Sequence, residues 1–211
     1  MLSPIRDQGQ RNTCVAFAVS AAHEVARAAG KAVIEDLSEE ALYWGCKRID
    51  GNWNPGSRFV SAATALGRWG QPSESIWPYD QTRTDGVPHH PPTPPAASTW
   101  FRSGLRQIAL DATELRTHLD SGAPVALELV LFDTFLTPDA SGVIVEPPSG
   151  APTRGRHAVL AVGYDTDSLL IRNSWGDTWA LGGYAWLSDG YTLRHGRSAW
   201  VIDARAVAPK R

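Results

Sequence analysis

The amino-acid sequence predicts an α+β fold with two lobes, because helical patterns fill its first half and strand patterns fill most of the second. A proline-rich segment, residues 82–99, lies between the two regions and shows almost no periodicity, which is typical of an extended connection. Helices that come first and strands that come afterwards argue against alternating β-α-β units. We therefore expect one helical lobe and one lobe built around a sheet.

Four helices are predicted from apolar residues at helical spacing and from residues that favour helix ends. Thr13 is a suitable N-cap for the first helix and Gly30 ends it. Ser38 opens the second helix, which has acidic residues in its first turn. Gly70 ends the third and Gly122 the fourth. The predicted helices cover residues 13–30, 37–49, 57–70 and 111–122.

Five strands are predicted in the second half, from runs of apolar and β-branched residues that are bounded by turn residues. The third and fourth strands flank the sequence DTDS and are expected to form a hairpin. The predicted strands cover residues 124–131, 142–146, 157–164, 168–175 and 183–187.

The composition excludes several classes of function. Apolar residues make up 43% and charged residues 20%, as in ordinary globular proteins, and a net charge of −2 gives no general attraction to nucleic acid or to an anionic membrane. No apolar run approaches the roughly 20 residues of a membrane span, and no secretory signal is visible. The two cysteines lie in no CxxC or Cys/His cluster, so we expect no metal, no cofactor and reduced thiols, in a cytoplasmic protein or one delivered from the cytoplasm.

Cys14 is the first candidate for a catalytic residue. It lies at the start of the first predicted helix, where unpaired N–H groups and the positive end of the helix dipole stabilise a thiolate. A small buried apolar residue is equally compatible with this position. A nucleophile needs a base, so the histidines decide between these interpretations.

Five of the six histidines offer no base for such a thiol. His23 is on the opposite side of the first helix from Cys14 and is expected at the surface. His118 lies on a charged helix, His195 falls in a polar segment, and the remaining pair, residues 89–90, lies in the proline-rich connection.

His157 differs, because it opens the predicted hairpin. The turn makes His157 and Asn173 cross-strand neighbours, so that the amide can hydrogen-bond one ring nitrogen and leave the other directed at a substrate or a thiol. Trp175 lies on the same face as Asn173 and would shield this bond from water. The alternative is that His157 merely begins one strand and Asn173 merely ends the next.

Three segments together resemble the active-site blocks of the papain-like (family C1) cysteine peptidases, namely QGQRNTCVAF, RHAVLAVGY and IRNSWGDTWALGGYAWL. The order Cys14, His157, Asn173 matches that of the family, and so does the 143-residue separation of the first two. The resemblance extends from about residue 3 to about residue 187.

The resemblance implies a single papain-like domain over residues 1–211, with the active site in a cleft between its lobes. The helical lobe would cover about 8–99, and a barrel-like antiparallel β lobe would cover about 100–211 together with the N-terminal residues. Gly56 and Ser57 match the positions that bind the substrate backbone.

The same resemblance assigns the chemistry. Cys14 would attack a peptide carbonyl as a thiolate paired with protonated His157, and Asn173 would orient the ring. Gln8 matches the glutamine whose side-chain amide, together with the Cys14 backbone N–H, receives the developing oxyanion.

The sequence also departs from the family pattern. Arg11 stands where a disulfide cysteine is usual and Val15 where an aromatic residue is common, which favours a bacterial-type or intracellular branch. Only 13 residues precede Cys14, so we expect no inhibitory propeptide and control by a regulatory partner or a parent multidomain protein instead. Arg156 either favours acidic substrate residues or is an ordinary surface arginine.

We therefore predict a cysteine endopeptidase that acts on peptide or protein substrates. A histidine pair at residues 89–90 resembles that of an exopeptidase relative, but the cysteines that hold that loop are absent. Two alternatives remain: an acyl-transferring enzyme with the same nucleophile, and a catalytically silent binding domain on the same fold.

Overall fold

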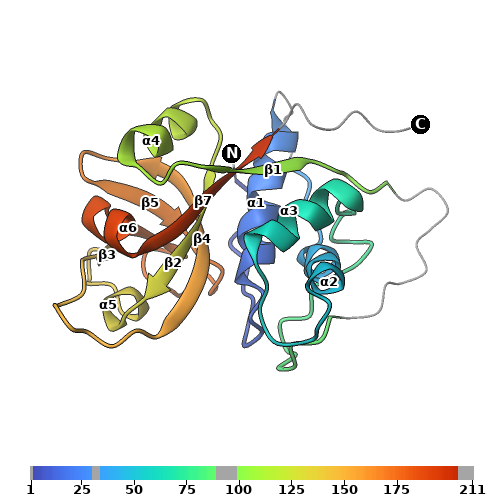
Figure 1. Cartoon of the computed structure of the whole chain (residues 1–211), viewed down its shortest axis with the longest axis horizontal. Coiled ribbons are helices and arrows are strands. Elements are labelled where there is room, and N and C mark those ends of the chain that lie inside the picture. The colour runs from blue at the N-terminus through green and yellow to red at the C-terminus, as the bar shows by residue number, and fades with distance from the viewer. Residues whose placement is uncertain (1, 30–33, 89–98, 204–211) are drawn as a thin grey trace. The chain divides into compact units, whose positions relative to one another are not determined.

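Figure 1 shows the computed structural model, which describes residues 2–29, 34–88 and 99–203. The chain forms two compact units. The helical unit falls within residues 1–4, 8–106 and 202–211, and the sheet unit within residues 5–7 and 107–201. Gly30, His89 and His90 lie outside the described residues. The α+β class is confirmed, because helices dominate the first unit and a sheet dominates the second.

The helical unit contains α1 (Cys14–Ala28), α2 (Glu39–Asp50) and α3 (Phe59–Arg68), which confirm three of the predicted helices. Ser38 caps α2 as expected, because its Oγ accepts the Ala41 N–H at 3.0 Å. Gly51 ends α2 in the left-handed conformation, with a φ of 68°, and donates its N–H to the Lys47 carbonyl. None of the helices among the described residues is long and apolar enough to cross a membrane.

His23 is buried in α1, so the prediction that it lies at the surface is wrong. Its Nδ1 lies 3.0 Å from Gln71 Oε1, and Gln71 Nε2 donates to Ser20 Oγ at 2.6 Å. The prediction rested on one fact, that His23 lies on the opposite side of the helix from Cys14, and took that side to be exposed to solvent. The alanine-rich α1 is covered on more than one side, because both α2 and α3 pack against it.

The α2 and α3 helices pack closely at Gly45. A Cβ atom on Gly45 would lie 2.9 Å from the Ala65 Cβ, so glycine permits the approach. Trp44 contacts Trp69 and Trp77, with ring centroids 5.6 and 5.8 Å apart. These contacts fix the position of α2, which carries residues important for the site described below.

The sheet has seven strands among the described residues, in the order β1-β7-β2-β4-β5-β6-β3. The neighbours among β7, β2, β4, β5 and β6 pair antiparallel, and β3 pairs parallel with β6. The strands are β1 (Gly104–Ile108), β2 (Val125–Leu131), β3 (Val143–Ile144), β4 (Gly155–Tyr164), β5 (Ser168–Arg172), β6 (Tyr184–Ser188) and β7 (Gly196–Asp203).

Three short helices accompany the sheet: α4 (Ala112–Asp120), α5 (Asp133–Leu136) and α6 (Asp189–His195). The predicted fourth helix and all five predicted strands are present, although β3 is only two residues long. The sequence analysis missed β1, β7, α5 and α6. His195, which was predicted to lie in a polar loop, is the last residue of α6. Its ring contacts that of Phe132, with the centroids 4.7 Å apart.

The β4–β5 hairpin forms as predicted, but its ladder ends before it reaches Asn173. Leu160 pairs with Arg172, and β5 ends there. The Asn173 N–H instead donates to the Gly183 carbonyl at 2.9 Å, so Asn173 has left the ladder with β4. His157 lies in β4, where its backbone pairs with Leu129 of the neighbouring strand β2. The two predicted partners therefore meet only through their side chains.

Candidate active site

Cys14 is the first residue of α1, as the sequence predicts. Thr13 occupies the N-cap position but makes no capping bond, because its Oγ1 lies 2.8 Å from the Tyr79 hydroxyl instead. The first turn of α1 also contains no acidic residue. The positive end of the helix dipole at Cys14 is therefore not neutralised by a side chain of the helix start, which favours the thiolate.

Gln8 lies on the loop that leads into α1 and is held through both its side chain and its backbone. The side-chain Nε2 of Gln8 donates to the Arg11 carbonyl at 2.7 Å, and the backbone carbonyl of Gln8 accepts the Tyr79 hydroxyl at 2.8 Å. The Arg11 carbonyl also accepts the Thr13 N–H at 2.8 Å. One of the two amide hydrogens of Gln8 thus fixes the side chain, and the same carbonyl fixes the start of the helix that carries Cys14.

His157 and Asn173 are brought together in the sheet unit. His157 Nε2 lies 2.7 Å from Asn173 Oδ1, and the Ser174 N–H donates to the same oxygen at 2.8 Å. An oxygen that accepts a backbone N–H cannot be the amide nitrogen, so the orientation of the Asn173 amide is defined. His157 Nε2 must therefore carry the proton and donate it, and a neutral ring has its lone pair on Nδ1.

Aromatic side chains surround this pair, as the position of Trp175 led us to expect. The Trp175 and His157 rings have centroids 4.5 Å apart, and the Phe135 ring lies 6.0 Å from His157. Burial lowers the pKa of His157 to about 4, while the hydrogen bond to Asn173 acts in the opposite direction. In this environment the His157 ring is neutral at neutral pH, unless a nearby anion stabilises its protonated form.

Gly56 and Ser57 lie on a loop that a buried ion pair holds in place. Lys47 Nζ donates to the Gly56 carbonyl at 2.9 Å, to the Asn54 carbonyl at 2.7 Å and to Asp50 Oδ2 at 3.1 Å. The Ser57 hydroxyl donates to the same Asp50 oxygen at 2.9 Å. Burial acts to raise the pKa of Asp50, but the hydrogen bonds it accepts outweigh burial, so this pKa is lowered. Gly56 itself has a φ of 86°, which favours glycine.

Other candidates from the sequence have ordinary surroundings. Arg156 is exposed and lies 3.2 Å from Glu128, with which it forms an ion pair. His118 Nε2 lies 3.3 Å from Glu114 Oε1 on α4. Cys46 is buried in α2, where burial raises the pKa of its thiol to about 12. No disulfide links the two cysteines of the chain, and the part of the chain that the structure describes contains no cluster suited to a metal ion.

The residues that hold the candidate site in place were not predicted from the sequence. Lys47 and Asp50 are three residues apart on α2, so their pairing could have been found from helical spacing. Tyr79 and Glu40 gave no such signal, because their contacts with the loop of residues 8–13 join segments that are far apart in the sequence. Only tertiary structure reveals those contacts.

A cysteine at the start of a helix and a histidine held by an asparagine are typical of thiol-dependent hydrolases. Comparison with known proteins agrees. The sequence model described as "Papain family cysteine protease" matches residues 1–204. The chain therefore belongs to the papain family of cysteine proteases.

Individual relatives are similar to most of this chain. The oryzain gamma chain of Oryza sativa subsp. japonica is 30% identical over 193 residues, which cover 87% of this chain and 51% of that protein. Stem bromelain of Ananas comosus is 25% identical over 211 residues, 96% of this chain and 90% of that protein. The crystal structure of xylellain, a cysteine protease from Xylella fastidiosa, has a TM-score of 0.83 at 24% identity and covers 95% of this chain and 82% of that one.

These comparisons confirm the papain-like fold and the family. The chain spans 51%, 62% and 58% of the length of three curated relatives, among them the oryzain gamma chain. Most of the curated relatives are eukaryotic, so they lend little support to the prediction of a bacterial-type branch.

Proposed function

We propose that the chain is a cysteine endopeptidase that hydrolyses peptide bonds through Cys14. The observation that carries the proposal is the hydrogen bond from His157 Nε2 to Asn173 Oδ1, because it leaves Nδ1 to exchange a proton with a thiol. Membership of the papain family and the position of Cys14 at the start of α1 support the same assignment.

In this proposal Cys14 is a thiolate and His157 an imidazolium before substrate binds. The sulfur attacks the peptide carbonyl and forms a carbon–sulfur bond, and the Gln8 amide and the Cys14 N–H donate to the oxyanion. His157 gives its proton to the leaving amine, and the carbon–nitrogen bond breaks. His157 then takes a proton from water, which attacks the acyl thioester and releases the acid, so that Cys14 is restored as a thiolate.

We propose that peptide or protein substrates bind along the loop that contains Gly56 and Ser57. Lys47 occupies one lone pair of the Gly56 carbonyl, and the second lone pair of that oxygen can accept an N–H of a substrate backbone. Because the Ser57 hydroxyl is already bonded to Asp50, we expect Ser57 to contribute shape and main-chain atoms rather than its side-chain oxygen.

Selective alkylation tests this proposal. Iodoacetamide at neutral pH should modify Cys14 at least tenfold faster than an ordinary exposed thiol, because a thiolate is the reactive form. Cys46 provides an internal control, since burial raises its pKa to about 12 and it should stay unmodified in the folded protein. Mass spectrometry of the two cysteine-containing peptides measures both rates. Equal labelling of the two, or a rate for Cys14 no faster than that of a free thiol, would contradict the proposal.

Product analysis separates the alternatives that share the nucleophile. A peptidase releases a free acid when the acyl thioester meets water, whereas an acyltransferase yields a new amide when an amine is supplied. A silent binding domain would bind peptide and leave it intact.

Replacement of Lys47 by methionine should raise KM about tenfold while kcat changes less than threefold, because the Gly56 loop loses the two hydrogen bonds that Lys47 donates to its carbonyls. Concentrations of active enzyme should be set by titration with an irreversible epoxide. Arg48→Met is the matched control, since it removes the same charge from the neighbouring, exposed residue of α2. An unchanged KM for Lys47→Met, or an equal rise in both variants, would argue against this role of the loop.

A further inference from the structure

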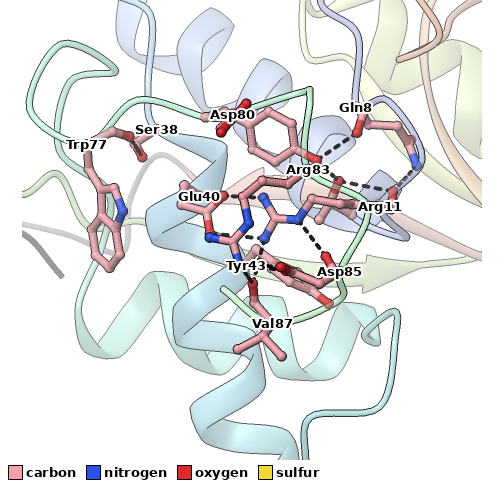
Figure 2. A network of polar contacts seen from close by, with 12 residues as sticks. Gln8, Arg11, Ser38, Glu40, Tyr43, Trp77, Asp80, Arg83, Asp85 and Val87 are labelled. Atoms are coloured by element: carbon pink, nitrogen blue, oxygen red, sulfur yellow. Dashed lines mark hydrogen bonds and ion pairs between the residues drawn. The ribbon is translucent and has the colours of Figure 1, made fainter. Parts of the chain in front are cut away.

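The Arg11 side chain forms a fully buried ion pair with Glu40 of α2 (Figure 2). Both side chains have no exposed surface, and the contact is bidentate, with Nη1 to Oε2 at 2.5 Å and Nη2 to Oε1 at 3.0 Å. The planar guanidinium matches a carboxylate in this geometry, and lysine cannot reproduce it. Burial acts to lower the pKa of Arg11, but Glu40 outweighs that effect and the pKa is raised, so the charge persists.

The remaining donors of Arg11 hold a third segment of the chain. Nε donates to the Asp85 carbonyl at 3.1 Å and Nη2 to the Val87 carbonyl at 3.3 Å. The guanidinium carbon also lies 4.9 Å from the centre of the Tyr79 ring. Arg11 thereby joins its own loop to α2 and to the segment that runs from Tyr79 to Val87.

The backbone carbonyl of Arg11 contacts two residues in the segment before the proposed nucleophile. Its carbonyl accepts the Gln8 side-chain amide and the Thr13 N–H, as described above. Tyr79 contacts the same two residues, because its hydroxyl donates to the Gln8 carbonyl and lies 2.8 Å from Thr13 Oγ1. Figure 2 shows Gln8 and Arg11 within this network, with the Arg11 side chain directed into the helical unit. A displacement of the Arg11 backbone would therefore displace the Gln8 amide.

We propose that Arg11 is a positioning residue that fixes the Gln8 amide for the oxyanion, through its buried ion pair with Glu40. This inference rests on the proposed peptidase function. The ion pair ties the loop to α2 without a thiol. The nucleophile must be reduced to act, and an ion pair holds the loop under the same reducing conditions.

Arg11→Lys tests the proposal, because it keeps the charge but loses the bidentate contact. We expect kcat to fall about 10- to 100-fold with KM within twofold of wild type, part of the 10²- to 10³-fold loss that follows removal of one oxyanion donor. The rate of Cys14 alkylation by iodoacetamide should stay within threefold, because that displacement forms no oxyanion. In a Gln8→Ala background, Arg11→Lys should lower kcat less than twofold further.

Two further variants separate positioning from general destabilisation. Glu40→Gln removes the charge of the partner without changing its shape, and should reproduce the fall in kcat if Arg11→Lys folds poorly. Gln71→Met is the matched control, because it breaks the buried hydrogen bonds to His23 and Ser20 in the same unit, and should lower the melting temperature with kcat per active site unchanged.

An unchanged kcat per titrated site in both Arg11→Lys and Glu40→Gln would overturn the proposal. So would an equal fall in the Gln8→Ala background, or alkylation that slows as much as turnover. Failure of the peptidase proposal itself is recognised separately, in the wild-type protein, which would then neither react with the epoxide at Cys14 nor cleave any peptide.

Discussion

Replacement of Cys14 by alanine is expected to lower kcat/KM for peptide cleavage about 10⁵- to 10⁶-fold, as loss of the nucleophile does in other proteases with a covalent intermediate. The first turn of α1 then contains no group that can carry the acyl chain, since Val15, Ala16 and Phe17 follow. Hydrolysis of a fluorogenic peptide library by the purified variant measures the effect. Circular dichroism establishes that the variant is folded.

Cys46→Ala is the control for this prediction. The Cys46 thiol is buried, and its pKa of about 12 keeps it protonated at neutral pH, so its removal should leave kcat/KM within about twofold. Cleavage by Cys14→Ala at more than a hundredth of the wild-type rate would show that another group carries the chemistry.

Replacement of His157 by alanine should lower kcat/KM about 10⁴- to 10⁶-fold and change how alkylation of Cys14 depends on pH. If the proposed ion pair forms in the wild type, the imidazolium keeps the thiol ionised, and the alkylation rate should be nearly constant between about pH 5 and pH 8. In the variant the rate should rise about tenfold per pH unit until the thiol is ionised, at a pKa that the start of α1 keeps somewhat below the ordinary value of about 8.5. His118 on α4 offers a control, since His118→Ala should change neither quantity.

The protonation state of His157 gives the same prediction a spectroscopic form. With no anion nearby, burial lowers the pKa of His157 to about 4, so its ring is neutral at every pH above that value and gains a proton only below it. In Cys14→Ala the ¹⁵N resonances of this ring should therefore titrate near pH 4. In the wild type a thiolate would stabilise the imidazolium, and the ring should still be protonated at pH 6. Identical titrations in the two proteins would argue against an ion pair.

The sequence predicted those parts of the fold that local patterns determine. The capping residue Ser38 and the apolar spacing of α1 to α3 marked helices that the structure contains, and the DTDS turn marked the β4–β5 hairpin. The strands β1 and β7 were missed. The sequence GLRQI of β1 has too few apolar residues to mark a strand, and its place in the sheet depends on β7, which is distant in the sequence.

The contact between His157 and Asn173 was predicted for a reason that is only partly right. The predicted register made them opposite residues of a ladder, whereas β5 ends at Arg172 and Asn173 reaches His157 with its side chain alone. The ladder ends at the pair formed by Leu160 and Arg172, and the residue at which a strand ends leaves no clear mark in a single sequence.

The parts of the site that sequence analysis did not find are held by long-range contacts. Arg11 was recognised only as a departure from the family pattern, because its partner Glu40 is 29 residues away and looks like an ordinary acidic residue in the first turn of α2. A glutamate there also stabilises the helix start, so no pattern in the sequence distinguishes that role from a buried ion pair.

The proposed peptidase forms an acyl thioester at Cys14, which rapid acid quenching followed by mass spectrometry can detect. A peptide ester that acylates faster than it hydrolyses should add the mass of its acyl group to the tryptic peptide that contains Cys14, within the first turnover. The adduct should be absent from Cys14→Ala and should disappear at the rate of product release in the wild type. Turnover of the ester without any adduct, or an adduct on another residue, would contradict the assignment of Cys14 as the nucleophile.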